Sequence, residues 1–326
     1  RLMRALVTGC AGFIGSQVTE ALLQRGDEVV GVDCFNDNYG RPQKLRNLRH
    51  FYDWDGFEFV PIDLGRGDLE QLTDDRDVVI HLAAEPGVRS SWGERYERYV
   101  HNNVIATQHL LEALKDRTDV RLVNASSSSV YGDAEQRPTP ETAPVQPLSP
   151  YGQTKLAAEH LCSLYVANYG LDAVSLRYFT VFGPRQRPDM AFHIFCRAAL
   201  EKRPITVFGD GRQTRDFSYV GDVVSATIAA ADRPLDEARV FNIGGGTPAS
   251  IREVLEMIEQ LAGHPLEVEY LDKERGDVRD TAADTALARE HLGFEPATSL
   301  EQGLGAEFEW LAEVVATRGS KPGTPR

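Results

Sequence analysis

The fold is decided by the stretch Gly9-Cys10-Ala11-Gly12-Phe13-Ile14-Gly15, which lies between the apolar run Arg4–Thr8 and a segment with helical spacing, Ser16–Arg25. Glycines at this spacing let the backbone approach a pyrophosphate, which then rests on the N-terminus of the following helix. The triplet alone is a weak signal. A strand before it and a helix after it are the context that a dinucleotide-binding turn requires.

Apolar runs and amphipathic segments alternate through the rest of the first half. Further strands are expected over Glu28–Val32, Phe57–Pro61, Val78–Leu82, Arg121–Ala125 and Asp172–Tyr178, and helices over Val104–Leu114 and Thr154–Asn168. Alternation of this kind implies right-handed crossovers and a parallel sheet with helices on both faces. We therefore expect an α/β fold built on a doubly wound parallel Rossmann sheet.

The alternation loosens after Tyr178, and the second half is expected to form a smaller α/β domain that caps the sheet. Its expected elements are Met190–Glu201, Pro204–Phe208, Asp222–Ala231, Val240–Ile243 and Ile251–Leu261. We expect residues 1–178 and about 216–247 to form the Rossmann domain. The second domain is expected to take about 179–215 and 248–316, and the polar tail 317–326 is expected to be disordered.

Composition excludes several classes of function. The chain has 326 residues and a net charge of −14, from 49 acidic and 35 basic residues, which argues against nucleic-acid binding. No apolar run approaches the ~20 residues that span a bilayer, and no signal peptide is expected. The four cysteines form no Cys-x-x-Cys pair and have no zinc spacing, so we expect reduced thiols, no metal and a cytoplasmic protein.

Asp33 ends the second expected strand, where a carboxylate bonds the ribose diol of adenosine. Because this carboxylate would repel a 2′-phosphate, the sequence indicates NAD and not NADP. Asp63 and Leu64 would lie near the adenine, although Asp63 serves almost equally well as a helix cap. His81 on an apolar strand is expected to be a core histidine, and the small residues after it would face the cofactor.

Tyr151 and Lys155 are four residues apart, which places both on one face of a helix. Lys155, together with the positive nicotinamide ring, would lower the pKa of Tyr151 below its usual ~10. A phenolate is a competent general base toward a sugar hydroxyl. Ser126-Ser127-Ser128-Ser129 follows the strand Arg121–Ala125, so its hydroxyls stand at the sheet edge where ligands bind.

The combination of these motifs resembles the extended short-chain dehydrogenase/reductase family over about Met3 to residue 312. The glycine triplet, Asp33, His81-Leu82-Ala83-Ala84, Val130-Tyr131-Gly132 and the Tyr151/Lys155 pair carry the resemblance. Within that family the chain is most similar to the UDP-glucuronate 4-epimerases. This closer similarity rests on Asp33–Tyr39, Pro86-Gly87-Val88-Arg89, Tyr178–Pro184, Arg187–Ala191 and, less specifically, Gln213–Phe217.

The resemblance implies an NAD cofactor, a UDP-sugar substrate and a homodimer. Its cofactor-binding positions fall on Gly9, Gly12, Phe13, Ile14, Gly15, Asp33, Asn36, Asp63, Leu64, Leu82, Ala83, Ala84, Asn103, Tyr151, Lys155 and Tyr178. Its substrate-binding positions fall on Arg89, Ser127, Ser128, Ser129, Thr180, Arg187, Phe208, Arg215 and Arg279. Tyr151, Lys155 and Ser127 are the implied catalytic residues.

The resemblance also implies individual roles. Ser127 would bond the 4-hydroxyl, Thr180 and Arg187 would lie near the acidic end of the sugar, and Phe208 would lie near the uracil. Arg215 and Arg279 would hold the diphosphate. Three positions depart from the family pattern: Ser127 stands where threonine is frequent, Pro86 where a small residue is usual, and Gln186 where glycine is common.

These features predict a UDP-glucuronate 4-epimerase that inverts carbon 4 through a 4-keto intermediate. A UDP-glucose 4-epimerase, or an epimerase for another UDP-hexose, is the alternative, because the chemistry is the same. A 4,6-dehydratase would need an Asp-Glu pair at Ser128-Ser129, and a decarboxylase an acidic residue in the same stretch. A regulator that only senses dinucleotide would not need the Tyr151/Lys155/Ser127 set.

Overall fold

The computed structural model describes residues 2–319 except 38, 236, 238, 274 and 275, and its centre is a seven-stranded sheet. The strand order is β10-β6-β5-β4-β1-β2-β3, and every neighbouring pair is parallel. The strands are β1 (Arg4–Thr8), β2 (Glu28–Asp33), β3 (Phe57–Pro61), β4 (Val78–His81), β5 (Arg121–Ser127), β6 (Asp172–Tyr178) and β10 (Val240–Ile243). The predicted doubly wound parallel sheet is confirmed.

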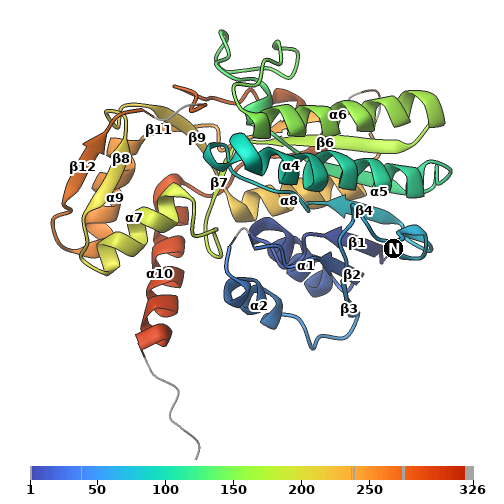
Figure 1. Cartoon of the computed structure of the whole chain (residues 1–326), viewed down its shortest axis with the longest axis horizontal. Helices are drawn as coiled ribbons and strands as arrows, with labels where there is room; N and C mark the ends of the chain where they lie inside the picture. Colours follow the sequence, from blue (N-terminus) through green and yellow to red (C-terminus); the bar gives the residue numbers. More distant parts are fainter. Residues whose placement is uncertain (1, 38, 236, 238, 274–275, 320–326) are drawn as a thin grey trace, which may run out of the picture.

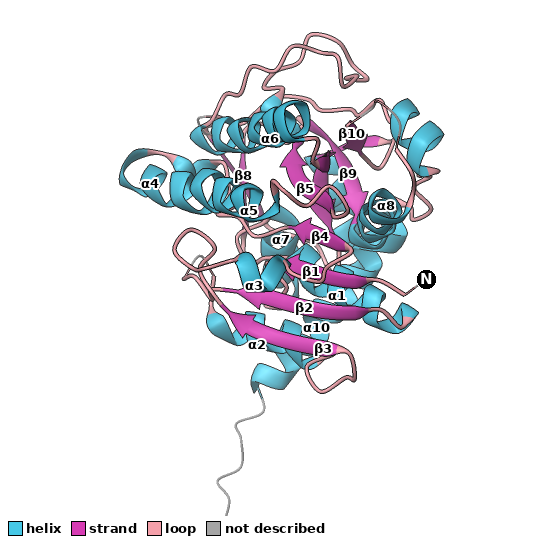
Figure 2. Ribbon diagram, turned by 90° about the vertical axis from the view of Figure 1, so that its right-hand side faces the viewer, coloured by secondary structure: helices cyan, strands magenta, loops and turns pink. Residues whose placement is uncertain are grey.

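Helices cover both faces of this sheet (Figure 2). One face is covered by α1 (Phe13–Arg25), α2 (Arg41–Arg49) and α8 (Val220–Asp232). The other is covered by α3 (Glu70–Thr73), α5 (Ala106–Leu114) and α6 (Pro150–Tyr169), and α4 (Tyr96–Tyr99) leads into α5 through a π-helical segment, η3 (Val100–Ile105). Strand β1 shows why the strands are apolar throughout: Ala5 and Val7 enter one core, and Leu6 enters the other.

The second half adds a smaller group of elements at one side of the sheet (Figure 1). A three-stranded sheet joins β7 (Thr180–Phe182), β9 (Thr214–Tyr219) and β11 (Pro248–Ser250), and a two-stranded sheet joins β8 (Ile205–Phe208) and β12 (Val268–Leu271). Helices α7 (Ala191–Leu200), α9 (Ile251–Ala262) and α10 (Leu300–Gly319) share a separate apolar core with them. We propose that the two domains divide along these cores, at the boundaries expected above.

The structure differs from the sequence-based expectation at the C-terminal end. A disordered tail is predicted from Thr317, but α10 continues to Gly319, and residues 320–326 lie outside the described part of the chain. The helix is stable there because Leu304, Phe308 and Leu311 are buried at helical spacing in the core of the smaller domain. None of the described helices combines the length and apolarity that a membrane crossing needs.

Candidate active site

A cavity of about 370 Å³ lies along the carboxyl edge of the parallel sheet. It is lined by residues at or just after the ends of six strands, β1, β2, β3, β4, β5 and β6. This edge is where open α/β sheets bind their ligands, and the volume falls within the range of ligand pockets. Among the residues that the structure describes, no group of three or more His, Cys, Asp or Glu side chains could hold a metal ion.

The glycine turn forms one end of the cavity. Gly9 has a left-handed φ of 72°, and a Cβ atom there would lie 2.9 Å from the backbone nitrogen of Ala83. A Cβ atom at Gly15 would lie 2.0 Å from the carbonyl oxygen of Gly9. Gly12, Phe13 and Ile14 also line the cavity at the start of α1. The turn therefore has the close backbone approach that a dinucleotide pyrophosphate needs.

Asp33 lies at the next strand end, buried and facing the cavity. Its Oδ1 accepts a hydrogen bond from the Phe35 amide at 2.8 Å and from Lys44 Nζ at 3.1 Å. Lys44 also donates to Asn36 Oδ1 at 2.9 Å and lies over the ring of Tyr39. Lys44 and Tyr39 both line the cavity. Sequence reasoning missed Lys44 because no motif marks it, whereas Tyr39 ends the stretch Asp33–Tyr39 that carries the resemblance but was given no binding role.

The cavity continues past Asp63, Leu64, Leu82, Ala83 and Ala84. Asp63 Oδ1 accepts from the Gly65 amide at 2.9 Å, so it both caps a turn and lines the cavity.

His81 lies behind this wall and hydrogen-bonds Thr8 Oγ1 at 2.8 Å and Thr107 Oγ1 at 3.0 Å. Burial lowers the pKa of His81 to about 3, which confirms it as a core histidine.

Asn103 does not line the cavity, whereas its neighbour Asn102 does. The Asn103 amide accepts from the Glu85 N–H at 2.6 Å and donates to the Glu85 carbonyl at 3.0 Å. It also donates to Thr154 Oγ1 on α6 at 2.9 Å. The structure therefore gives Asn103 a bracing position between the end of β4 and the helix of Tyr151.

Tyr151 and Lys155 reach the cavity from α6, and Ser127 and Tyr178 reach it from the ends of β5 and β6. Helix α6 begins at Pro150, earlier than the sequence predicts, because the Ser149 hydroxyl accepts from the Gly152 N–H at 3.1 Å. Tyr151 therefore lies in the first turn of the helix. The Ser127 hydroxyl accepts from the Ser129 N–H, which orients the serine turn.

The pKa of Tyr151 departs from the expectation. Burial raises it above 10, and the hydrogen bond of Ser127 and the charge of Arg187 lower it only in part. Lys155 is not among the groups that shift the pKa of Tyr151, and burial lowers its own pKa to about 8. The protein groups alone thus leave the pKa of Tyr151 raised, and the predicted lowering would need the positive charge of the nicotinamide ring.

Ser128, Ser129, Thr180 and Arg187 line the same cavity on the side of the smaller domain. The Arg187 guanidinium forms two hydrogen bonds with Asp189, from Nε at 3.0 Å and from Nη2 at 2.9 Å. Its charge lowers the pKa of Tyr151, so the guanidinium lies near this hydroxyl. A cation and three hydroxyls therefore surround the space next to Tyr151.

A second cavity of about 130 Å³ shares Ser128, Ser129 and Thr180 with the first and is also lined by Arg215. Arg215 donates to the carbonyl oxygens of Thr214, Val278 and Arg279. The remaining predicted substrate residues line neither cavity. The Arg89 guanidinium lies 4.5 Å from the centre of the Phe208 ring and pairs with Asp277 at 2.7 Å, whereas the Arg279 side chain is 81% exposed.

Two of the three departures from the family pattern, Gln186 and Pro86, lie in different surroundings. Gln186 is buried and braces the loop before Arg187, because its Nε2 donates to the Val181 carbonyl and its Oε1 accepts from the His193 N–H. Gln43 on α2 also donates to the Gln186 carbonyl at 2.9 Å. Pro86 lines the cofactor cavity, and its carbonyl accepts from the Tyr99 hydroxyl. Both positions are thus held by the surrounding fold.

A buried polar network joins the end of β5, where the serine run begins, to α6 and β6. Glu159 Oε2 on α6 accepts from Ser126 Oγ at 2.7 Å and from Arg177 Nε at 3.0 Å. Arg177 also donates to the Tyr131 hydroxyl at 2.7 Å, and Tyr131 donates to Asn242 Oδ1 at 2.7 Å. The network fixes the end of β5 against α6, and with it the approach of Ser127 to Tyr151.

The comparisons with known proteins agree with this site. The model of the NAD dependent epimerase/dehydratase family matches residues 5–244, and the chain belongs to that family. It is an NAD-dependent enzyme, as the glycine turn and Asp33 predict, and the resemblance to the extended short-chain dehydrogenases/reductases is confirmed.

Three relatives are informative. The crystal structure of UDP-glucuronic acid 4-epimerase from Bacillus cereus, in complex with UDP-glucuronic acid and NAD, has 43% sequence identity and a TM-score of 0.91, covering 96% of this chain and 100% of that chain. The UDP-glucuronate 4-epimerase of Thermodesulfobacterium geofontis is 42% identical over 94% of this chain and 96% of its own length. The uncharacterized UDP-glucose epimerase YtcB of Bacillus subtilis is 43% identical, over 96% of this chain and 99% of its own length.

The buried Asp33 carboxylate leads to a prediction about cofactor choice. We expect NAD to reactivate the apo-enzyme at a concentration at least about tenfold below that of NADP, because a 2′-phosphate would meet a carboxylate that has little access to water. Lys44→Met removes the neighbouring ammonium and should widen the difference. Equal reactivation of the wild-type protein by the two dinucleotides would show that Asp33 does not select the cofactor.

Proposed function

We propose that the chain is a UDP-glucuronate 4-epimerase, which interconverts the glucuronate and galacturonate forms of the UDP-sugar. The observation that carries the proposal is the arrangement of Arg187, Thr180, Ser128 and Ser129 around the space beside Tyr151. A guanidinium and several hydroxyls are the donors that a sugar carboxylate requires. The two relatives named for UDP-glucuronate support the choice of substrate.

In this proposal the Tyr151 phenolate removes the proton of the 4-hydroxyl, and Ser127 orients that hydroxyl. The glycine turn and Asp33 would hold NAD, which would supply a reversible hydride acceptor for carbon 4 and would be regenerated in each cycle. Lys155 lies one helical turn from Tyr151, where its ammonium can hold the nicotinamide ribose and stabilise the phenolate. Tyr151 returns the proton when the hydride is restored.

The same donors have a second task. A 4-keto hexuronate is a β-keto acid and tends to lose carbon dioxide. Arg187, Thr180 and the two serines would hold the carboxylate in a geometry that disfavours cleavage of the carbon–carbon bond. The hydroxyl cluster would thus control the product as well as the rate.

Arg187→Ala should erode the preference for the acidic substrate. We expect the wild-type protein to prefer UDP-glucuronate to UDP-glucose by at least about tenfold in kcat/KM, because a carboxylate can accept charge-assisted hydrogen bonds that a neutral hydroxymethyl group cannot. The variant should lose most of this preference because its kcat/KM for UDP-glucuronate falls while that for UDP-glucose changes little. It should also release more UDP-pentose. Arg203→Ala is the matched control, because Arg203 lies on the exposed surface of the same domain. The reading fails if the Arg187→Ala variant keeps the wild-type preference.

UDP-glucose 4-epimerase is the second candidate, and the name of the Bacillus subtilis relative favours it. Its chemistry needs the same Tyr151, Lys155 and Ser127. The Arg187–Asp189 pair separates the two candidates: a neutral sugar would leave this pair intact, whereas an acidic sugar would compete with Asp189 for the guanidinium.

The smaller cavity is proposed to hold the UDP moiety. Arg215 lines it and would contact the diphosphate, and Arg279, whose carbonyl bonds Arg215, would contribute from the surface. Phe208 would lie near the uracil, with Arg89 stacked on its ring. Binding at this place would extend the substrate from Tyr151 toward residues 276–278.

We also propose a homodimer. Helices α5 and α6 pack side by side on one face of the molecule (Figure 1). Three large side chains remain exposed on α6 and at the end of η3 just before α5, Ile105 at 38%, Leu164 at 56% and Tyr169 at 48%, and a second copy would cover them. Light scattering of the purified protein measures the oligomeric state, and a monomer at micromolar concentration would refute the proposal.

The cytoplasmic location expected from the sequence stays a prediction.

A further inference from the structure

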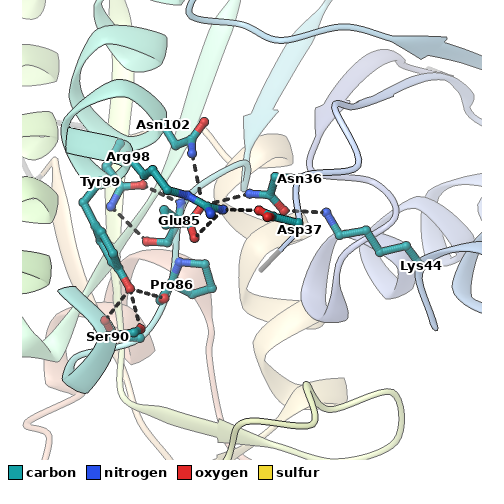
Figure 3. Close-up of polar contacts among 11 residues, drawn as sticks. Asn36, Asp37, Lys44, Glu85, Pro86, Ser90, Arg98, Tyr99 and Asn102 are labelled. Carbon is teal, nitrogen blue, oxygen red and sulfur yellow. Dashed lines mark hydrogen bonds and ion pairs between the residues drawn. The ribbon is translucent and has the colours of Figure 1, made fainter. Parts of the chain in front are cut away.

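Glu85 is a buried acid that the proposed chemistry does not use. It follows the cavity-lining residues Leu82-Ala83-Ala84 at the end of β4 and is 3% exposed. Its Oε2 accepts from Asn36 Nδ2 at 2.9 Å and from Asn102 Nδ2 at 3.1 Å, and its Oε1 accepts from Arg98 Nη2 at 3.2 Å (Figure 3). Burial raises the pKa of Glu85, and Arg98 and Asn102 counteract this shift.

These contacts join two walls of the cofactor cavity. Asn36 belongs to the loop after β2, and Asn102 belongs to η3, and both line the cavity. The connection continues on the first wall, because Lys44 donates to Asn36 Oδ1 and to Asp33 Oδ1 (Figure 3 shows the Lys44–Asn36 part). A continuous set of hydrogen bonds thus runs from the residue that selects the adenosine ribose to Glu85.

The second wall is hydrogen-bonded to α6, the helix that carries Tyr151 and Lys155. The Asn103 amide holds both the N–H and the carbonyl of Glu85 and also bonds Thr154 on α6. Tyr99, one turn before Asn103, donates to the carbonyls of Pro86 and Gly87, and its ring packs edge-on against Tyr151 at 6.3 Å between centroids. Glu85 therefore stands between the adenosine end and the nicotinamide end of the cavity.

A carboxylate suits this position because all three neighbouring groups are donors. An ionised glutamate is acceptor-only, so one oxygen can serve Asn36 and Asn102 while the other serves Arg98. A glutamine would turn an NH₂ group toward at least one of these donors and leave a buried pair of donors facing each other. Glutamine therefore preserves the shape of the side chain but removes its charge and at least one of these contacts.

We propose that Glu85 is a positioning residue that clamps the loop after β2 to the segment after β4 and so keeps NAD bound between turnovers. The need for retention rests on the proposed function, because an epimerase regenerates its NAD and gains nothing by releasing it. The clamp acts through Asn36 and Asn102, which face the cofactor space, and through Lys44 on Asp33. Glu85 itself lies outside the cavity lining and touches no reacting atom.

The test measures the release of NAD from the holoenzyme without any sugar present. Excess alcohol dehydrogenase and ethanol convert each released NAD to NADH, whose absorbance is followed over time. Glu85→Gln should release NAD about tenfold faster or more, as expected for losing a buried charge-assisted contact. Turnover at saturating NAD should fall by a much smaller factor, a split that general unfolding would not produce.

Two further variants keep the test interpretable. Asp37→Asn changes only the exposed outer partner of Arg98, at 2.6 Å, and should release NAD at the wild-type rate. Arg98→Met removes the cation but leaves both amide donors, so it should give an intermediate rate even if Glu85→Gln does not fold. The proposal would be overturned if the Glu85 and Arg98 variants released NAD at the wild-type rate. It would also be overturned if the variants changed NAD release and turnover by the same factor. Because no sugar is used, failure of the UDP-glucuronate assignment would leave this result unchanged.

Discussion

Tyr151→Phe should slow epimerisation by about 10²–10⁴-fold, the range typical for the loss of a general acid or base. The hydroxyl is the only group removed. The ring would still pack edge-on against Tyr99, and α6 would keep its Ser149 cap. NAD content and thermal stability should therefore match those of the wild-type protein. The measurement is the steady-state rate of UDP-sugar interconversion at saturating substrate.

Tyr169→Phe supplies the matched control for this experiment. Tyr169 is the last residue of the same helix, is 48% exposed, and does not line the cavity. Its loss of a hydroxyl should leave the rate unchanged. If the Tyr151→Phe protein turned over at the wild-type rate, Tyr151 could not be the base, and the hydroxyls of Ser127 and its neighbours would become the candidates.

Arg177→Met should lower the free energy of unfolding by about 3–5 kcal/mol, the range for removing one partner of a buried ion pair. Arg177 and Glu159 are both buried, and Arg177 also donates to the Tyr131 hydroxyl. Methionine fills part of the space but leaves the Glu159 carboxylate without its cation. Urea denaturation of the variant, loaded with NAD to the same extent as wild type, measures the loss.

A double variant tests the cause of that loss. Glu159→Gln removes the uncompensated charge, so Glu159→Gln/Arg177→Met should be more stable than Arg177→Met alone. Ser126 can still hydrogen-bond the glutamine. A double variant that is less stable than Arg177→Met would show that packing, and not the buried charge, dominates at this position.

Local motifs made much of the site predictable. The glycine turn and Asp33 lie within one β–α–β unit, so their relative position follows from the fold class. Tyr151 and Lys155 lie on one helix, and the serine run follows a strand, so their common location at the sheet edge could also be predicted. These residues required only correct recognition of strands and helices.

The residues that sequence reasoning missed depend on contacts between distant segments. Lys44 is recognised only once α2 is seen to bring it to Asp33, and Glu85 only once η3 and the loop after β2 meet around it. The resemblance places Asn103 among the cofactor-binding positions, and the structure shows its side chain hydrogen-bonded to Glu85 and Thr154. Spacing reveals the lysine near Tyr151 but not the cost of burying a phenolate, so the raised pKa of Tyr151 in the chain alone could not be predicted from the sequence.

Helix α10 could have been predicted, and the omission has a plain cause. Leu304, Phe308 and Leu311 have the spacing of one helical face and are buried in the smaller domain. The polar residues after Thr317 are typical of a disordered tail. A helix whose earlier turns are buried can nevertheless continue through several polar residues.

The central claim is the identity of the substrate, and one measurement tests it most directly. The purified enzyme is incubated separately with UDP-glucuronate and with UDP-glucose, and the products are identified by NMR at matched times. The account predicts that UDP-glucuronate is converted to UDP-galacturonate with little UDP-pentose, and that UDP-glucose is converted at least about tenfold less efficiently. Conversion of UDP-glucose to UDP-galactose as efficiently as the acidic sugar would contradict it and would make the second candidate the function of this chain.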